Sequence, residues 1–120
     1  MEHSEGFLRL VEDARGRVRE VSVEQARARM REGARLFDVR EDNEWERSRA
    51  RGAEHLGRGV IERDIERRVP DKGAELILYC GGGYRSALAA DNLQRMGYAN
   101  VFSMAGGWRA WQEAGAPIEE

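Results

Sequence analysis

Residues 76–90 read Leu76-Ile77-Leu78-Tyr79-Cys80-Gly81-Gly82-Gly83-Tyr84-Arg85-Ser86-Ala87-Leu88-Ala89-Ala90. The first four form a short apolar run, which is typical of a strand buried on both faces of a sheet. The glycines after the cysteine should interrupt that strand, because glycine has no side chain to pack and loses the most backbone entropy on ordering. From Arg85 or Ser86 onward the alanines and leucines favour a helix, which Gly97 should end. The pattern predicts a strand, a glycine loop and a helix, with Cys80 where the strand stops.

The predicted loop has the chemical features of an anion pocket. The glycines can turn successive backbone N–H groups inward, the helix adds the positive end of its dipole, and Arg85 adds a full charge. Such surroundings favour the thiolate form of Cys80, which is the form that attacks electrophiles. We expect Cys80 to be the nucleophile, Ser86 to cap the helix and Tyr84 to lie at the pocket mouth. The expected substrate-binding residues of the loop are Gly81, Gly82, Gly83, Tyr84, Arg85 and Ser86.

The segment Cys80–Ser86 resembles the active-site loop of the rhodanese-like, single-domain sulfurtransferases. The similarity extends from roughly residue 20 to the C-terminus, since three more stretches stand in that family's order and spacing. They are Leu36-Phe37-Asp38-Val39-Arg40, Pro70-Asp71-Lys72 and Gly106-Gly107-Trp108-Arg109-Ala110-Trp111. One segment departs from the family pattern. Where Gly-His-Ile-x-Gly-Ala is usual, this chain has Ser48-Arg49-Ala50-Arg51-Gly52-Ala53, so only the Gly-Ala pair remains.

Strand-like and helix-like segments alternate along the chain, which favours a parallel sheet covered by helices on both sides. The resemblance implies an α/β fold of the rhodanese-like type. This is a three-layer sandwich with a central, mostly parallel sheet of about five strands and helices on both faces. We expect residues 1–16 to form an N-terminal helix or extension and residues 17–120 to form the rhodanese-like domain. Ligands of such sheets bind at the carboxyl ends of the strands, where Cys80 falls.

The composition narrows the class of protein. A chain of 120 residues, 41% hydrophobic and 35% charged, is one water-soluble domain with a core of its own. It has neither an apolar run of membrane-spanning length nor a signal-peptide pattern, so we expect a cytoplasmic protein without a membrane partner. The net charge of −2 gives no reason to expect a nucleic-acid partner. Cys80 cannot form an internal disulfide, and with His3 and His55 it makes no ligand set, so no metal and no cofactor are expected.

Other residues are assigned from the resemblance. Asp38 and Arg40 are expected to brace the loops around the site through buried ion pairs and caps, rather than to catalyse. Gly106 and Gly107 are expected to let their loop approach the wall of the active site. Arg58 stands between two glycines and has two interpretations. It either reaches an anionic substrate or is a surface arginine at a helix start.

Three functions compete for this chain. The resemblance implies a sulfurtransferase, in which Cys80 takes a sulfane sulfur from a small anionic donor such as thiosulfate. The sulfur is held as a persulfide and passed to cyanide, to a thiol or to a protein acceptor. The alternatives are a non-catalytic sulfur- or redox-sensing binding module and a cysteine-dependent phosphatase on the same fold. Four residues separate Cys80 from Arg85, whereas phosphatase loops of this type are longer, and this favours sulfur transfer.

Overall fold

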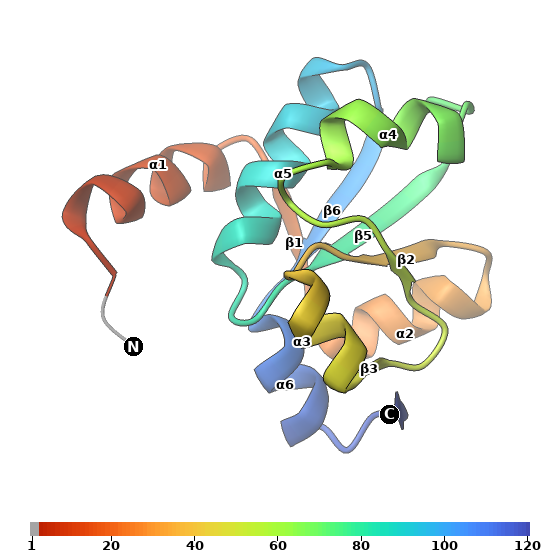
Figure 1. Cartoon of the computed structure of the whole chain (residues 1–120). Helices are drawn as coiled ribbons and strands as arrows, with labels where there is room; N and C mark the ends of the chain where they lie inside the picture. The colour runs from red at the N-terminus through yellow and green to blue at the C-terminus, as the bar shows by residue number, and fades with distance from the viewer. Residues whose placement is uncertain (1–2) are drawn as a thin grey trace.

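A computed structural model describes residues 3–120 as a three-layer α/β fold (Figure 1). The central sheet has five parallel strands in the order β1-β6-β5-β2-β4. The bounds of these strands are Arg19–Val21 (β1), Arg35–Asp38 (β2), Glu54–His55 (β4), Glu75–Tyr79 (β5) and Asn100–Met104 (β6). The α/β class and the parallel sheet of five strands, both predicted from the sequence, are confirmed.

Helices cover both faces of the sheet (Figure 1). One face carries α4 (Ile61–Arg68) and α5 (Tyr84–Arg95), and the other carries α2 (Val23–Arg31) and α6 (Gly107–Glu113). Strand β5 is buried on both sides, because it lies between the two layers of helices. Successive side chains of a strand point to opposite faces of the sheet. Its residues divide between the two cores. Leu76 and Leu78 pack in the core with α4 and α5, whereas Ile77 and Tyr79 pack in the core with α2 and α6.

Local sequence signals fix the ends of several elements. A capping box begins α2. The Gln25 N–H donates to the Ser22 hydroxyl at 3.1 Å, and the Ser22 N–H donates to the Gln25 side chain at 2.8 Å. Gly33 then turns the chain with a left-handed φ of 110°. The apolar stripe of α4 buries Ile61 and Ile65 completely.

Three short elements were not predicted as such. They are helix α3 (Asp42–Arg47) and strands β3 (Arg49–Ala50) and β7 (Ile118–Glu119). The two strands pair antiparallel and form a separate small sheet. A strand of two residues is too short to show the alternation from which strands are recognised.

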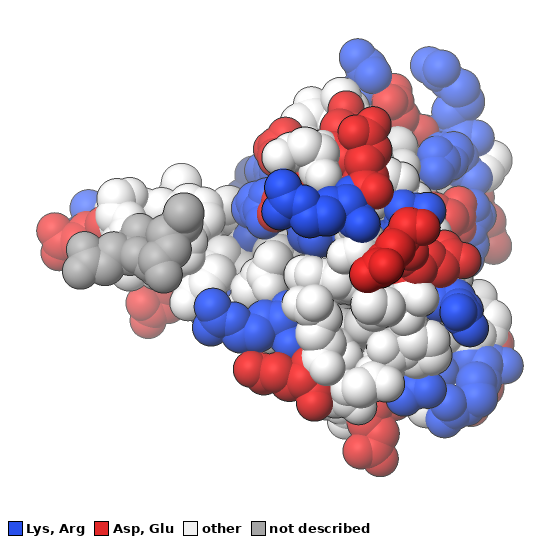
Figure 2. Space-filling model, turned by 60° about the horizontal axis from the view of Figure 1, so that its bottom comes forward, with Lys and Arg blue, Asp and Glu red and all other residues white. Residues whose placement is uncertain are grey.

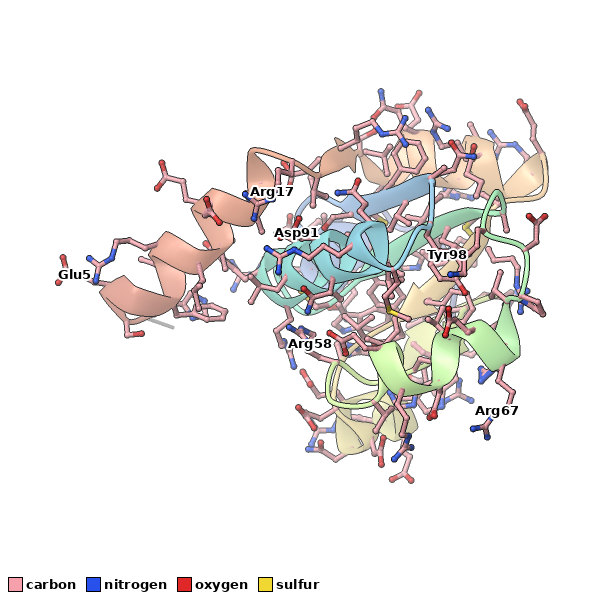
Figure 3. The ribbon with its side chains drawn as sticks, turned by 90° about the horizontal axis from the view of Figure 1, so that it is seen from above. Glu5, Arg17, Arg58, Arg67, Asp91 and Tyr98 are labelled. Atoms are coloured by element: carbon pink, nitrogen blue, oxygen red, sulfur yellow. The ribbon has the colours of Figure 1, made fainter. Side chains whose placement is uncertain are left out.

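Helix α1 (Glu5–Arg15) lies within the segment expected to be an N-terminal helix or extension, and Met1 and Glu2 lie outside the described residues. Figure 1 shows that α1 extends away from the sheet and joins the rest of the molecule beside α5. Val11 and Ala14 are its buried residues. The guanidinium of Arg17 binds both carboxylate oxygens of Asp91 on α5, at 2.9 and 2.8 Å (Figure 3). The helix is therefore held at its C-terminal end.

Charged residues of both signs intermix over the face shown in Figure 2. Arginine supplies almost all of the positive charge, and many of its side chains pair with nearby carboxylates, as Arg35 does with Glu54 at 2.7 Å. None of the helices within residues 3–120 has the length and apolar character needed to cross a membrane.

Leu93→Ala should lower the free energy of unfolding by about 3 kcal/mol, because Leu93 of α5 is fully buried and alanine leaves a cavity. Leu10→Ala is the matched control: Leu10 on α1 is 61% exposed, and its change should cost about 0.5 kcal/mol or less. Urea unfolding followed by circular dichroism measures both values. Equal losses in the two variants would contradict the packing described above.

Candidate active site

Cys80 lies between the end of β5 and the start of α5, at the carboxyl edge of the sheet. Its side chain is 1% exposed, yet it lines a cavity of about 700 Å³ that opens to solvent. The cavity is lined by His3, Phe7, Glu44, Cys80, Gly81, Gly82, Tyr84, Arg85, Gly106 and Arg109. The predicted loop therefore borders the cavity along most of its length. The contributions of His3, Phe7, Glu44 and Arg109 were not predicted.

The sulfur of Cys80 is held by the backbone. The Gly83 N–H donates to Sγ at 3.1 Å and the Ser86 N–H donates to Sγ at 3.3 Å. Both donors belong to the N-terminal end of α5, where the helix dipole is positive, so the arrangement stabilises negative charge on sulfur. Within residues 3–120, the N–H groups of Gly81 and Gly82 have no hydrogen-bond partner. These two groups remain able to bind an anion beside the sulfur.

The expectation that Ser86 caps the helix was wrong. The cap of α5 is Gly83, whose φ of 98° is left-handed and suits glycine better than serine. Ser86 instead lies in the first turn, fully buried, with its hydroxyl 3.5 Å from Sγ and 2.8 Å from the hydroxyl of Ser103 on β6. Gly83 and Ser86 thus hold the sulfur from below and do not line the cavity.

Arg85 lines the cavity but is already paired. Its Nη1 and Nη2 donate to the carboxylate of Glu44 on α3 at 3.0 and 3.4 Å. Partial burial works to lower the pKa of Arg85, but the hydrogen bonds and charge of Glu44 outweigh burial and raise it. Partial burial likewise works to raise the pKa of Glu44, and the hydrogen bonds from Arg85 and from the Glu41 N–H lower it on balance. An anion entering the cavity must therefore share Arg85 with a carboxylate that is ionised at neutral pH.

Arg58 is not brought to this cavity. Its guanidinium pairs at 2.9 Å with Glu62, which stands four residues later in the first turn of α4 (Figure 3). Asn92 of α5 donates to the same carboxylate at 2.8 Å. Of the two interpretations, this is the position of a surface arginine at a helix start.

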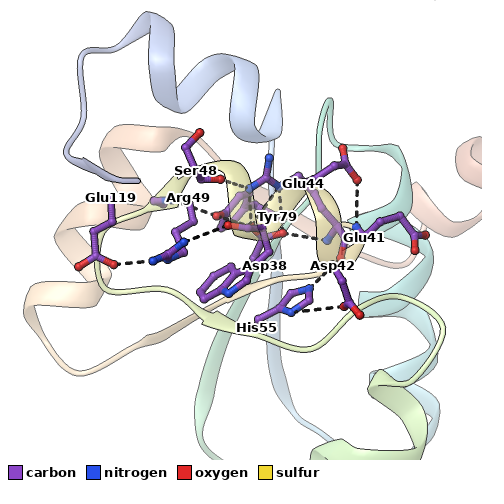
Figure 4. Close-up of polar contacts among 12 residues, drawn as sticks. Asp38, Glu41, Asp42, Glu44, Ser48, Arg49, His55, Tyr79 and Glu119 are labelled. Atoms are coloured by element: carbon purple, nitrogen blue, oxygen red, sulfur yellow. Dashed lines mark hydrogen bonds and ion pairs between the residues drawn. The ribbon is translucent and has the colours of Figure 1, made fainter.

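Asp38 and Arg40 form a buried ion pair at the end of β2 (Figure 4). The Asp38 carboxylate accepts hydrogen bonds from the Arg40 N–H and guanidinium at 2.8–3.1 Å and from the Tyr79 hydroxyl at 2.6 Å. Burial and the charge of Asp38 raise the pKa of Tyr79, so its hydroxyl stays protonated and acts as a donor. Because Tyr79 directly precedes Cys80, this network fixes the backbone from which the cysteine loop starts.

The first turn of α6 packs against the cysteine loop. The Trp108 N–H donates to the Cys80 carbonyl at 2.7 Å, and the Arg109 N–H donates to the Gly81 carbonyl at 3.2 Å. Gly107 makes this approach possible, since its φ is 52° and a Cβ there would lie 2.2 Å from the Cys80 oxygen. Among residues 3–120, no three His, Cys, Asp or Glu side chains gather in a way that could hold a metal ion.

Comparison with protein families matches residues 22–114 to the rhodanese-like domain. The chain belongs to the rhodanese-like family. Among its relatives is the thiosulfate sulfurtransferase GlpE of Haemophilus influenzae, 35% identical over 101 residues, with 84% of this chain and 94% of the relative covered. The Arabidopsis thaliana mitochondrial protein HIGH ARSENIC CONTENT 1 is 34% identical over 131 residues, with 95% of this chain and 75% of the relative covered. The relatives named thiosulfate sulfurtransferase GlpE, together with the match to the rhodanese-like domain, support a rhodanese-type sulfurtransferase.

Solved structures share the same rhodanese-like fold. A possible tyrosine phosphatase of unknown function from Rhodopseudomonas palustris superimposes with a TM-score of 0.82 at 28% identity, covering 99% of this chain and 98% of the neighbour. The polysulfide-sulfur transferase homodimer of Wolinella succinogenes also superimposes with a TM-score of 0.82, at 24% identity. The match covers 95% of this chain and 87% of the neighbour. The second likeness concerns the fold alone.

The rhodanese-like pattern is broken at Ser48–Ala50, and the structure shows how the segment works without the usual side chains. The Ser48 carbonyl accepts from Arg40 at 2.7 Å, and the Ala50 N–H donates to the Tyr79 hydroxyl at 3.1 Å. Both contacts use backbone atoms. The network around Asp38 is therefore complete without the histidine and isoleucine that the family pattern has here.

Gly107→Ala should lower the free energy of unfolding by about 3 kcal/mol or more, because the new Cβ meets a backbone oxygen that no side-chain rotation can move. Gly115→Ala is the matched control. Gly115 also has a left-handed φ, 68°, but open space around it, so about 1 kcal/mol is expected from backbone strain alone. Thermal or urea unfolding measures the difference, and similar losses in both variants would refute the close approach.

Proposed function

We propose that this rhodanese-like protein is a sulfurtransferase that carries sulfane sulfur on Cys80. The donor is a small anion such as thiosulfate, and the acceptor is a nucleophile such as cyanide or a thiol. The observation that carries the proposal is the pair of backbone N–H groups, from Gly83 and Ser86, that point at Sγ at the floor of the cavity. The relatives named thiosulfate sulfurtransferase support the same activity.

In the first step the Cys80 thiolate attacks the outer sulfur of thiosulfate. A new S–S bond forms to Sγ, the S–S bond of thiosulfate breaks, and sulfite leaves with the bonding electron pair. The N–H groups of Gly81 and Gly82 and the guanidinium of Arg85 bind the negative charge of the donor. The step uses Cys80 as the thiolate, whose charge the Gly83 and Ser86 N–H groups stabilise, and sulfite is a good leaving group.

In the second step the acceptor attacks the outer sulfur of the Cys80 persulfide. The bond between the two sulfurs breaks, and its electron pair returns to Cys80 as the thiolate. The N–H groups that hold Sγ are in place before either step, so the loop stabilises the charge without rearranging. Catalysis on this account relies on a preformed backbone cradle.

A phosphatase function is the alternative that the Rhodopseudomonas palustris neighbour suggests by its description. The loop length favours sulfur transfer. Only four residues separate Cys80 from Arg85, and a loop this short surrounds a single sulfur atom better than a tetrahedral phosphoryl group. A redox-sensing module is the remaining alternative, because the same thiolate could be oxidised instead.

Wild-type protein treated with excess thiosulfate and desalted should gain the mass of one sulfur atom, which cyanide should remove as thiocyanate. Intact-mass spectrometry measures the adduct. Cys80→Ser should show neither adduct nor thiocyanate formation, because Cys80 is the chain's one cysteine and an oxygen nucleophile holds no stable sulfane sulfur.

The same samples separate the alternatives. Hydrolysis of an aryl phosphate without a sulfur adduct would establish the phosphatase and refute sulfur transfer. If the protein forms no sulfur adduct and hydrolyses no aryl phosphate, the sensing module would be the remaining function.

Glu44→Gln should lower the KM for thiosulfate about fivefold, because it removes a negative charge that competes with the donor for Arg85. The pKa of Glu44 is lowered, so the wild-type protein keeps this competition throughout the neutral range. Glu46→Gln changes an exposed carboxylate on the same helix and should shift KM less than twofold. Steady-state kinetics at fixed ionic strength measures both, and an unchanged KM in Glu44→Gln would show that the donor does not use Arg85.

A further inference from the structure

The cavity has one wall that comes from outside the part of the chain matched to the rhodanese-like domain. His3 and Phe7, from the segment before residue 22, line the same cavity as Cys80. Their rings meet that of Tyr84, with centroid distances of 4.5 Å for His3–Tyr84, 6.2 Å for Phe7–Tyr84 and 5.1 Å for His3–Phe7. We call His3, Phe7 and Tyr84 the ring wall.

The ring wall is held in position relative to the sulfur. Arg15 at the end of α1 donates to the Gly83 carbonyl at 3.4 Å and lies 5.0 Å over the Tyr84 ring. Arg17 binds Asp91 of α5, and hydrogen bonding and charge from Arg17 lower the pKa of that carboxylate. Helix α1 is thus attached to α5, whose first turn holds Sγ.

The cavity is larger than the proposed inorganic donor requires. A volume of about 700 Å³ lies in the range of sites that bind organic molecules, whereas thiosulfate and cyanide are ions of a few atoms. The ring wall offers apolar and aromatic surface on one side. Arg109, an exposed residue of α6, lines the cavity as well and supplies positive charge. These features suit a molecule with an apolar or aromatic body and an anionic group.

We propose that the ring wall selects the sulfur acceptor and favours organic thiols that carry an aromatic or apolar body and a carboxylate. The inference rests on the proposed sulfurtransferase function. The acceptor thiolate attacks the outer sulfur of the Cys80 hydropersulfide, so a bond forms between the acceptor sulfur and that outer sulfur. The S–S bond to Cys80 breaks, its electron pair stays on Cys80 as the thiolate, and the proton stays on the transferred sulfur. The balance needs no external oxidant or reductant.

The experiment compares two acceptors with one donor. With saturating thiosulfate, sulfite release is measured with 4-mercaptobenzoate and, separately, with cyanide. The ratio of the two kcat/KM values, thiol over cyanide, should fall about tenfold in Phe7→Ala, because the aromatic contact is lost. Phe7→Leu should recover part of the ratio, since leucine keeps apolar surface without a ring. Leu10→Ala, an exposed position on the same helix, should keep the wild-type ratio.

The outcomes distinguish this inference from the function on which it rests. The Cys80 sulfur adduct is first measured by mass in every variant. If the adduct forms and Phe7→Ala keeps the wild-type ratio, or loses activity equally with both acceptors, the ring wall does not select the acceptor and the sulfurtransferase function stands. If wild-type protein forms no adduct, both proposals are overturned.

Discussion

The buried charge of Asp38 is the constraint on which the arrangement of the site depends. A carboxylate that is 0% exposed costs several kcal/mol unless it is paired and hydrogen-bonded. Asp38 is satisfied by Arg40 on its own segment and by Tyr79 on β5, while Arg40 reaches on to the Ser48 carbonyl. These partners come from separate parts of the chain. Satisfying one charge therefore sets the relative positions of the end of β2, the end of β5 and the segment after α3.

The cysteine loop uses this framework on two sides. On one side, Tyr79 fixes the end of β5, from which the loop starts. On the other side, Gly107 allows the start of α6 to lie against the Cys80 carbonyl. The loop is thus held by its carbonyl groups, which leaves its N–H groups free to face the sulfur and the cavity. Side chains then adjust the charge around a backbone site, as Glu44 does by pairing with Arg85.

The sequence predicted the features that depend on neighbouring residues. The strand, glycine loop and helix of residues 76–90 follow from apolar runs and glycine. It could not predict contacts between distant segments. Nothing in the pattern pairs Arg85 with Glu44 or brings Phe7 to Tyr84, because many surface residues have the same chemistry. The error at Ser86 arose because the left-handed φ of Gly83 depends on how the loop enters the helix.

The backbone contacts of Ser48 and Ala50 have a consequence for how such sequences can change over time. A carbonyl is present whatever side chain a residue carries, and an N–H is present in every residue except proline. These two hydrogen bonds therefore do not depend on which side chains stand at positions 48 and 50, although Ala50 is fully buried and has room only for what the core admits. A motif defined by side chains at these positions would then be lost sooner than the architecture it marks. Chains of this fold can therefore drift out of reach of a signature at residues 48–50 while Cys80 remains held in the same way.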